Sequence, residues 1–408
     1  MRIAVVMPRG SVMGRDKANS MEMVARTLLQ HSRHKATVRI ICDAGADVPA
    51  LSDLMTVPAG LSKTKRADAV AELLAGFDPD YIEYHQQLES AASLARRYPT
   101  KINVLYRHTR IKQPKNLLDR MRYGARLKAF DKLIFVSKAA GAEFIGDYPA
   151  LADRVSSICN PIEIDAWKAS PDKREKLILF SGRAMEEKGL EPFCEALAAV
   201  LDTAPDWRGA LMLGDWDRHE AWAGPRIAAL ARFGDRVEIH KSASLPQVQA
   251  VTRRAAIAVT PSFVAEALGL SALEAHAAGA ALISSGRGGL REASGDHAVY
   301  VDPPHAAGLT EAMSALVTNA NRRIAMARAG QKFVAAVHAP AVRAAQLDDL
   351  RETLVAERAQ SAVREAVRAR TPLLQRIAAA LSGRPWSVQP ASWTFRTVVR
   401  EHVEWIRA

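Results

Sequence analysis

The sequence predicts an α/β protein built from two Rossmann-like domains in tandem. The chain has 408 residues, more than one hydrophobic core usually organises. Short apolar runs alternate with amphipathic helical patterns, which is typical of parallel sheets covered by helices. The alternation breaks once, at residues 160–176, and then restarts. A tandem of two similar domains explains all three observations.

The first domain is predicted to span residues 1–165. An amphipathic helical stretch at 21–29 follows its first apolar run. Its strand candidates are the apolar runs RIAVVMP (2–8), TVRIICD (37–43), YIEYH (81–85), INVLYRH (102–108) and KLIFVS (132–137).

The second domain is predicted to span residues 166–337. Its strand candidates are KLILFSG (176–182), GALMLGD (209–215), RVEIHK (236–241), AAIAVTPS (255–262) and AALISSG (280–286). Helical periodicity continues through 338–370 without a following strand, so we expect a helical segment that crosses back between the domains. The tail 371–408 carries Trp386, Trp393 and Trp405 and shows no repeat.

Composition narrows the class of protein. Hydrophobic residues make up 49% and charged residues 25%, as in ordinary globular proteins. No apolar stretch is long enough for a membrane-spanning helix, and the first residues are too short for a signal peptide, so we expect a cytoplasmic protein. Cys42, Cys159 and Cys194 lie far apart and are interpreted as reduced structural thiols.

Charge indicates an anionic partner. The formal net charge is +12 at pH 7, which suits nucleic acid, an acidic lipid surface or phosphorylated substrates. The cations gather between residues 101 and 128, and the run is interrupted only by Asp119. Its members are Lys101, Arg107, Arg110, Lys112, Lys115, Arg120, Arg122, Arg126 and Lys128.

The segment from Thr260 to Pro303 carries the most chemical information. We expect a strand end, a proline turn, a helix that opens at Glu266, and Glu274 two turns later. At about 100° per residue, both carboxylates would face one cleft at different depths. Without further context, Glu266 and Glu274 could equally well be two solvent-exposed glutamates on an Ala-rich helix. Gly269 near the helix start adds free backbone N–H groups, which suit a diphosphate.

The strings EALGLSALEAHAAG (266–279) and GGLRE (288–292) resemble the glutamate-pair motif of the retaining glycosyltransferases of family 4. The resemblance is strongest over 177–303 and diffuse over the rest of 1–355. It implies the GT-B fold, in which two Rossmann-like domains face each other across a cleft. A second matching string is FSGRAMEEKGL, residues 180–190.

The resemblance also implies site residues. Arg183 and Lys188 would grip the donor diphosphate and neutralise the charge that grows as the sugar bond breaks. Glu274 would bind the ribose hydroxyls, and Glu266 would lie beside the transferred sugar. Gly269 and Leu270 would offer backbone N–H groups to phosphate, and His108 would face the sugar from the first domain. For the two cations and the histidine, ordinary surface positions are the alternative.

The first loop matches the family less well. Gly10 and Gly14 follow the first strand where a tight double glycine is usual, and either could approach the donor. The loop contains no GxGxxG pattern, which argues against a nicotinamide dehydrogenase. Asp78-Pro79-Asp80 and Asp215-Trp216-Asp217 have the spacing of metal-binding Asp-x-Asp motifs, but both fit turns. We therefore expect no cofactor and no required metal.

Together with these patterns, the family resemblance implies a retaining hexosyltransferase. It would move a hexose-type sugar from a nucleoside-diphosphate sugar to a cell-envelope glycan or lipid acceptor, in lipopolysaccharide or polysaccharide biosynthesis. Two alternatives stay open: a nucleotide-sugar epimerase of the same fold, and a non-enzymatic two-lobed sugar-binding protein.

Residues 116–130 predict an interfacial helix. Leu117, Leu118, Met121 and Ala125 form one stripe with cations around it. The stripe and the basic run beginning at Lys101 favour peripheral contact of residues 101–130 with the anionic inner membrane. An ordinary helix packed on its own sheet is the alternative. Nucleic acid is not expected as a partner because aromatic stacking residues are sparse there.

Overall fold

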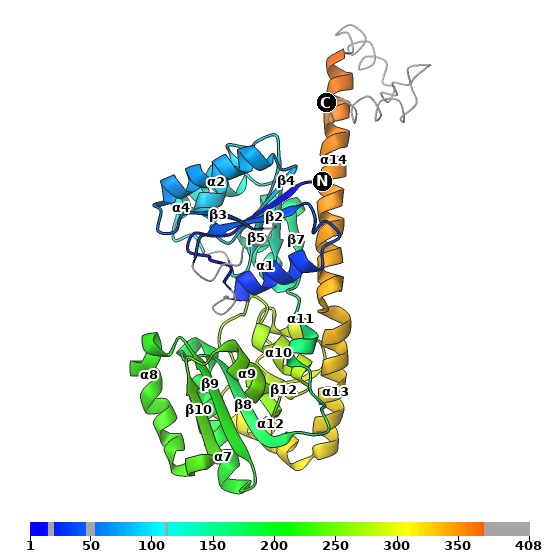
Figure 1. The fold of residues 1–408 in the computed structure, drawn as a ribbon. Coiled ribbons are helices and arrows are strands. Elements are labelled where there is room, and N and C mark those ends of the chain that lie inside the picture. Colours follow the sequence, from blue (N-terminus) through cyan, green and yellow to red (C-terminus); the bar gives the residue numbers. More distant parts are fainter. Residues whose placement is uncertain (15–19, 46–53, 111–112, 371–408) are drawn as a thin grey trace. The chain divides into compact units, whose positions relative to one another are not determined.

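The computed structural model describes residues 1–14, 20–45, 54–110 and 113–370, and these form two parallel sheets flanked by helices (Figure 1). The predicted α/β class with two Rossmann-like domains is confirmed. Lys112 of the basic run and the tail 371–408 lie outside the described residues.

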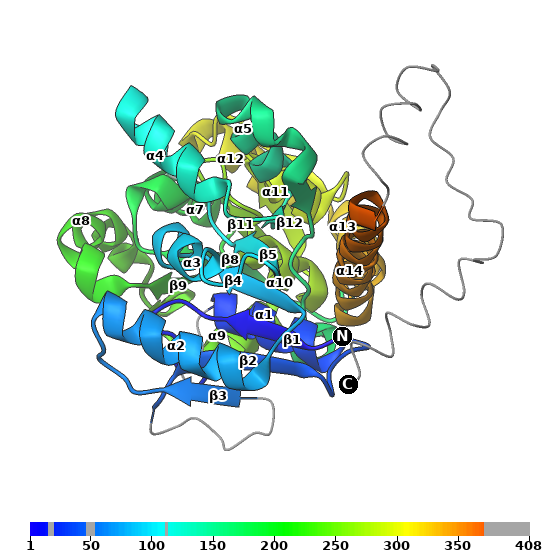
Figure 2. The same ribbon diagram turned by 90° about the horizontal axis from the view of Figure 1, so that it is seen from above.

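The N-terminal sheet has the strand order β3-β2-β1-β4-β5-β6-β7, and its pairings are parallel. The five predicted strands are present, and β3 and β7 were not predicted. These two are four and three residues long, which is too short for an alternating pattern to stand out. The strands are β1 (Ile3–Val6), β2 (Val38–Asp43), β3 (Leu54–Val57), β4 (Tyr81–His85), β5 (Ile102–Arg107), β6 (Lys132–Phe135) and β7 (Val155–Ser157). Figure 2 shows β3 at one edge of this sheet, beside β2.

Helices cover both faces of the N-terminal sheet because alternate strand residues point to opposite sides. Val5 and Ile40 pack with α1 on one face. Val6 and Ile41 pack with α2 and α3 on the other. The helices of this part are α1 (Ser20–Gln30), α2 (Lys63–Phe77), α3 (Leu88–Ala95), α4 (Leu117–Leu127), α5 (Lys138–Asp147), the 3₁₀ segment η1 (Pro149–Arg154) and α6 (Ile164–Trp167).

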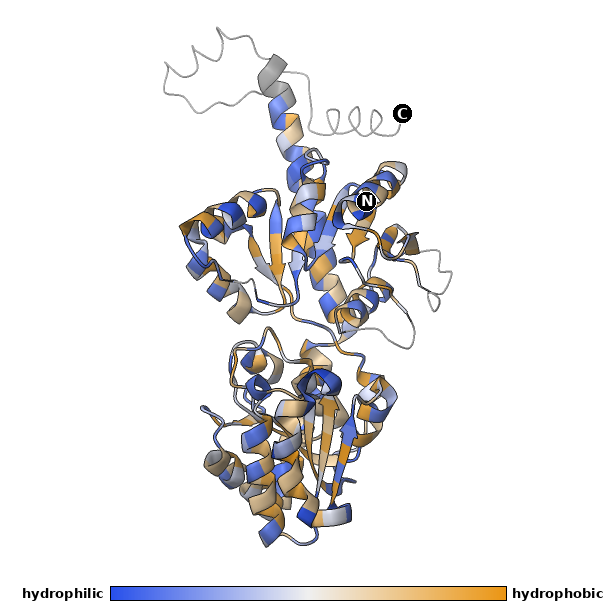
Figure 3. Cartoon of the chain, turned by 90° about the vertical axis from the view of Figure 1, so that its left-hand side faces the viewer, coloured by the Kyte–Doolittle hydropathy of each residue, from blue (hydrophilic) through white to orange (hydrophobic). Residues whose placement is uncertain are grey.

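The C-terminal sheet repeats the plan with the order β10-β9-β8-β11-β12-β13, again with parallel pairings. Its strands are mostly hydrophobic (Figure 3), as expected for a sheet covered on both faces. The short β13 was not predicted. The strands are β8 (Glu175–Arg183), β9 (Arg208–Gly214), β10 (Val237–Lys241), β11 (Ala255–Thr260), β12 (Ala281–Ser284) and β13 (Ala298–Tyr300).

The helices of the C-terminal part follow the strands in turn. Phe180 and Leu211 pack with α7 and α12 on one face of the sheet, and α9 covers Leu177 and Met212 on the other. These elements are η2 (Glu186–Lys188), α7 (Leu190–Thr203), α8 (Trp216–Ala228), η3 (Ala229–Arg236), α9 (Leu245–Thr252), α10 (Leu270–Ala278), α11 (Leu290–Ser294), α12 (Ala306–Thr318) and α13 (Ala320–Val337).

The predicted crossing segment is the helix α14 (Pro340–Arg370), which follows the C-terminal sheet but contacts the N-terminal one. Asp348 accepts a hydrogen bond from Ser32 Oγ at 2.8 Å, and Arg351 Nη2 lies 2.9 Å from Glu83 Oε2 of β4. The predicted boundary between residues 165 and 166 falls inside α6. Residues 1–355 form one compact unit.

The predicted structural thiols have no disulfide partner. Cys42 and Cys194 are buried, and Cys159 is half-buried. Burial raises the pKa of Cys42 and Cys159 to about 11 and that of Cys194 to about 12. Within the described residues, no helix combines the length and the apolar character that a bilayer span requires.

Candidate functional site

A cavity lies at the carboxyl ends of β8 and β11, the neighbouring strands between which the order of the C-terminal sheet reverses. Open α/β sheets bind ligands at this position, because the loops leaving the two strands diverge to opposite faces. The cavity measures about 830 Å³, and residues of the N-terminal part also line it, among them His108, Thr109 and Asn160. Its volume suits a small-molecule ligand.

Glu266 does not lie on a helix, so the prediction that a helix opens there was wrong. Helix α10 begins at Leu270, after Gly269 with φ +101°. The Glu266 backbone pairs with Gly288 in an isolated β-bridge, and its carbonyl accepts a hydrogen bond from the Gly289 N–H at 2.8 Å. Backbone groups bonded in this way cannot join a helical ladder. Glu266 and Glu274 still line the same cavity, from a loop and a helix respectively.

The glycines of the GGLRE string explain how the Glu266 loop is held. A Cβ atom at Gly288 would collide with the backbone of Glu266, and one at Gly289 with the backbone of Ala267. A Cβ at Gly269 would strike Leu290. Only glycine permits these approaches, so the glycines fix the course of the Glu266 loop, while Leu290 of the same string lines the cavity.

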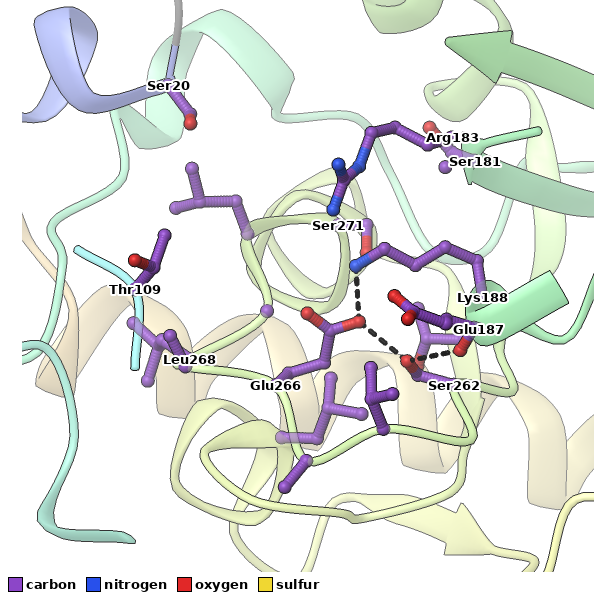
Figure 4. Close-up of a pocket in the computed structure, with 18 of the residues that line it drawn as sticks. Ser20, Thr109, Ser181, Arg183, Glu187, Lys188, Ser262, Glu266, Leu268 and Ser271 are labelled. Carbon is purple, nitrogen blue, oxygen red and sulfur yellow. Dashed lines mark hydrogen bonds and ion pairs between the residues drawn. The ribbon is translucent and has the colours of Figure 1, made fainter. Parts of the chain in front are cut away.

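Lys188 is placed by contacts between its turn and the segment that follows β11. Gly189 has φ +72°, and a Cβ there would collide with the Pro261 carbonyl. The Phe263 N–H donates to the Glu187 carbonyl at 2.9 Å. As a result Lys188 Nζ lies 2.5 Å from Glu266 Oε1 (Figure 4).

The cationic wall of the cavity contains Arg183 as well as Lys188. Arg183 is the last residue of β8 and is exposed, and within the described residues it has no carboxylate partner. In Figure 4 the Arg183 and Lys188 side chains point into the same space, beside Ser271 in the first turn of α10. The first N–H groups of a helix lack intrahelical acceptors and attract anions. Two cations and this helix start therefore surround a position suited to phosphate.

Glu274 lies in the second turn of α10 and also lines the cavity. Burial raises the pKa of its carboxyl to about 7. A side chain that is partly protonated at neutral pH can accept or donate a hydrogen bond, which suits a hydroxyl ligand.

His108 follows the end of β5 and lines the cavity from the N-terminal part. Its Nε2 lies 2.8 Å from His85 Nδ1, and His85 Nε2 lies 2.9 Å from Glu83 Oε1. Burial is the main reason that the pKa of His108 lies well below its usual value. This buried chain of side chains was not predicted.

The chain of contacts selects the tautomer of His108. Glu83 is held ionised: burial alone would raise its pKa, but the Arg351 charge and the His85 hydrogen bond lower it to about 2. An ionised carboxylate only accepts, so His85 donates from Nε2, and with that single ring proton its Nδ1 accepts. His108 then donates from Nε2, and its Nδ1, which has no partner, is left as an acceptor.

Gly10 and Gly14 are not on the described wall of the cavity. The Gly10 N–H donates to Asp43 Oδ2 at 2.9 Å, and the Gly14 carbonyl accepts from Arg26 at 3.4 Å. The described residues of α1 that line the cavity are Ser20 and Met21. Neither Asp-x-Asp candidate lines it: Asp78 pairs with Lys101 at 2.6 Å, and Asp215 precedes α8.

Sequence reasoning also missed Ser262, whose Oγ lies 2.7 Å from Glu266 Oε1 and 3.1 Å from the Glu187 carbonyl oxygen. A short polar residue directly after β11 was its only signal. Glu83 and His85 had a clearer one, because two polar residues spaced by two in a buried strand point to the same side. Their partner Arg351 is remote in sequence.

Comparisons with known proteins find similarity to glycosyltransferases. Residues 161–333 match the family model for glycosyl transferases group 1. A D-inositol 3-phosphate glycosyltransferase of Pseudarthrobacter chlorophenolicus is 30% identical over 213 residues, which are 48% of this chain and 50% of that protein. A phosphatidyl-myo-inositol mannosyltransferase of Mycobacterium tuberculosis is 31% identical over 183 residues, 42% of this chain and 47% of that protein.

The chain spans about half the length of these curated relatives. Among solved structures, the Anabaena protein HepE in complex with UDP superposes with a TM-score of 0.69 at 15% identity, over 86% of this chain and all of that one. That likeness establishes the two-domain fold. Residues 161–333 are thus a glycosyl transferases group 1 domain, within a chain that has the GT-B fold.

Proposed function

We propose that the protein is a retaining hexosyltransferase that uses a nucleoside-diphosphate sugar and a cell-envelope glycan or lipid acceptor. One observation carries the proposal. Arg183, the Lys188–Glu266 pair and the start of α10 surround a single cavity at the carboxyl edge of the C-terminal sheet. His108 lines the same cavity from the N-terminal part. Cations suited to a diphosphate thus lie beside polar groups suited to a sugar.

Each residue has a physical role in this proposal. Arg183 and Lys188 neutralise the charge that develops on the leaving diphosphate, and the N–H groups of Gly269 and Leu270 bind the same phosphate. Glu274 binds the ribose hydroxyls. Glu266 and the Nδ1 acceptor of His108 bind hydroxyls of the transferred sugar and orient its anomeric carbon.

Retention follows from a front-face displacement. The acceptor hydroxyl oxygen bonds to the anomeric carbon on the face from which the diphosphate oxygen departs, as the bond from that carbon to the diphosphate breaks. The hydroxyl proton passes to the departing phosphate oxygen, so the leaving group is its own base. The cations make a separate metal unnecessary in this scheme.

The acceptor class rests on the relatives. One is named for D-inositol 3-phosphate and another for phosphatidyl-myo-inositol, and the solved HepE complex holds UDP. These names favour a nucleotide-sugar donor and a polyol or lipid-linked acceptor. We keep lipopolysaccharide or polysaccharide biosynthesis as the proposed setting.

Helix α4 supports work at a membrane surface. Leu117, Leu118 and Met121 are 73%, 66% and 65% exposed, whereas Leu127 is the buried residue of the helix. The apolar stripe therefore does not pack on its own sheet. Arg122 has no ion-pair partner within the described residues and remains available to anionic lipid. We propose that α4 contacts the anionic inner membrane peripherally.

The function is tested with a panel of UDP-, GDP- and ADP-sugars, screened first by thermal shift and then by nucleotide release with and without candidate acceptors. A transferase releases nucleotide faster when its acceptor is present, and we expect a chelator to leave that rate unchanged. Formation of a new nucleotide sugar without acceptor would instead identify an epimerase. A ligand-induced shift without any turnover would identify a sugar-binding protein.

A further inference from the structure

Three described arginines are almost fully buried, and only two of them face a carboxylate. Arg66 lies 2.5 Å from Asp43, and Arg351 contacts Glu83 and Asp348. Arg107, at the end of β5, is 8% exposed and has no ion pair within the described residues. A buried charge without a counter-charge is strongly unfavourable. Binding of an anion would therefore stabilise the buried charge of Arg107.

The neutral contacts of Arg107 do not replace that anion. One guanidinium nitrogen donates to the Gln86 carbonyl, and Nη2 donates to the Arg110 carbonyl at 3.0 Å. Its Nε has no partner. Burial lowers the pKa of the guanidinium to about 10, the direction expected where no carboxylate stabilises the charge.

Arg107 lines a second cavity, of about 410 Å³, together with three further cations, Arg9, Lys63 and Arg126. Glu89 is the one carboxylate on its described lining, and it lies 3.5 Å from Lys63 and 3.3 Å from Arg126. Four cations against one carboxylate leave a formal charge of +3 on this wall. Such an excess favours an anionic ligand.

The start of α3 contributes a second feature suited to an anion. Leu88, Glu89 and Ser90 open this helix and line the cavity, and the N-cap residue Gln87 makes no side-chain hydrogen bond to the helix. Backbone N–H groups at an uncapped helix start bind phosphate well. Arginine adds fork-shaped donors that match phosphate oxygens.

We propose that this second cavity binds a phosphate group of the acceptor. The inference rests on the proposed function, because it gives the cavity a role in positioning the acceptor. Arg107 lines this second cavity. The next two residues, His108 and Thr109, line the first cavity, in which we propose that the donor binds. Gln86 also lines the second cavity, and its side-chain oxygen accepts a hydrogen bond from the His108 N–H at 3.1 Å. A bound phosphate would thus lie next to the strand end that faces the sugar.

Two sources of such a phosphate fit: a soluble phosphorylated polyol, or the headgroup of a lipid. Helix α4 is consistent with a lipid headgroup as the source, because the same helix lines the cavity and carries exposed apolar side chains. Tyr123 and Arg126 line the cavity. Leu117, Leu118 and Met121 are exposed. Both sources present the same chemistry to the arginines, a phosphate that bears an alcohol with free hydroxyls.

The test measures binding of inorganic phosphate by calorimetry in an Arg183→Ala/Lys188→Ala background, which removes the donor-site cations. We expect phosphate binding to persist there, and to weaken about tenfold or more when Lys63→Gln and Arg126→Gln are added. Lys65→Gln, on the exposed part of the same helix α2, is the matched control. Lys63 and Arg126 reach solvent, so folding should be retained, and circular dichroism checks it. Arg107→Gln is measured separately.

Absence of phosphate binding in the background, or equal binding after the two substitutions, overturns the proposal. Glycosyl transfer by the wild type is assayed independently, so a failed phosphate site and a failed function are distinguishable. The source is assigned by competition. Displacement of phosphate by glycerol 3-phosphate indicates a soluble acceptor, and displacement only by phosphatidylcholine vesicles that contain phosphatidic acid indicates a lipid. Displacement by neither also overturns the acceptor role.

Discussion

At the scale of single residues, the proposed function gives the contact between Lys188 and Glu266 a role in both donor binding and chemistry. The pair is half-buried at 2.5 Å and lies where a diphosphate and a sugar would meet. When a diphosphate enters, it competes with Glu266 for the lysine, and the carboxylate becomes free to bind sugar hydroxyls. In this proposal the pair keeps both side chains beside the cavity before the donor arrives.

We predict that Lys188→Ala and Glu266→Gln each lower kcat about 10²-fold, because each removes a group aimed at charge or hydroxyls of the reacting sugar. Steady-state kinetics with the identified donor measure the effect. Lys176→Ala, a surface lysine paired with Asp206, is the control and should keep the wild-type rate. Near-normal turnover of either site variant would contradict the assignment.

Glu274 gives a pH-dependent prediction. Its folded-state pKa, about 7, lies above the ordinary value of 4.5. The stability that this raised pKa contributes is complete below about pH 4.5 and is lost as the pH rises to about 7. Glu274→Gln has no proton to lose, so the variant should lack this loss, which amounts to up to about 3 kcal/mol.

The Glu274 comparison uses urea denaturation of the ligand-free protein at about pH 5 and about pH 8. Glu187→Gln, at an exposed glutamate beside the same cavity, controls for the change in net charge. If wild type and Glu274→Gln lose the same stability between the two pH values, the Glu274 carboxyl is not the cause.

At the scale of elements, β4 and β5 act together because their adjacent ends present His85 and His108. The rings of His85, Tyr106 and His108 stack on one another, with centroid distances of 5.1 Å between His85 and Tyr106 and 4.9 Å from His108 to each of the others. A neighbouring strand therefore orients the histidine that faces the cavity, and the ionised Glu83 on β4 selects its tautomer.

We predict that His85→Phe keeps the stacking but releases the tautomer of His108, because both hydrogen bonds of residue 85 are lost. The ¹⁵N chemical shifts of His108 should move from the Nε2–H pattern toward a mixture, and kcat should fall about tenfold. His240→Phe, on the edge strand β10, serves as the control. Unchanged ¹⁵N shifts in His85→Phe would show that the relay does not set the tautomer.

Helix α4 carries the prediction on membranes. Replacing Leu117, Leu118 and Met121 with serine should reduce co-sedimentation with anionic vesicles several-fold, because these exposed side chains supply the apolar area that enters the bilayer. Wild-type binding should also weaken at high salt, since the surrounding cations contribute. Equal binding by the variant and the wild type, or no binding by either, would leave a soluble acceptor.

At the scale of the whole molecule, contacts far apart in sequence join the two sheets' elements within residues 1–355. Glu292 of the GGLRE string does not line the cavity but accepts hydrogen bonds from the Lys138 and Ala139 N–H groups, both at 2.7 Å, at the start of α5. Asp348 and Arg351 of α14 bind Ser32 and Glu83. The crossing helix therefore stabilises the N-terminal domain and also keeps Glu83 ionised.

Arg351→Met should destabilise the protein by about 3–5 kcal/mol at neutral pH, because it leaves Glu83 buried without its cation. In the wild type the lowered pKa of Glu83 stabilises the fold above about pH 4.5, and this contribution is lost as the pH falls through about 2. The variant raises that pKa, so its deficit should shrink in acid. Chemical denaturation at about pH 7 and about pH 4 measures this. A deficit that is equal at both pH values would contradict the role of Glu83.

The sequence alone was sufficient for much of the fold. Long apolar runs with a regular period predicted ten of the described strands and the crossing helix, because burial of parallel strands depends mainly on local composition. Arg183, Lys188, Glu266, Glu274 and His108, which the family resemblance implied as site residues, all line the cavity, whereas Gly10 and Gly14 do not. Sequence reasoning failed for β3, β7 and β13, whose short runs carry no readable period.

Only the tertiary structure decided how those residues are held. The backbone of Glu266 bonds to Gly288 and Gly289, so Glu266 lies in a loop although its local sequence favours a helix. These backbone contacts outweigh local helix propensity. Glu83 and Arg351 are 268 residues apart, and Arg107 lacks a carboxylate among all its described neighbours. Pairing and its absence depend on which chain segments meet in space. Local sequence therefore predicts which groups carry the chemistry, whereas their charge and orientation follow from the packed fold.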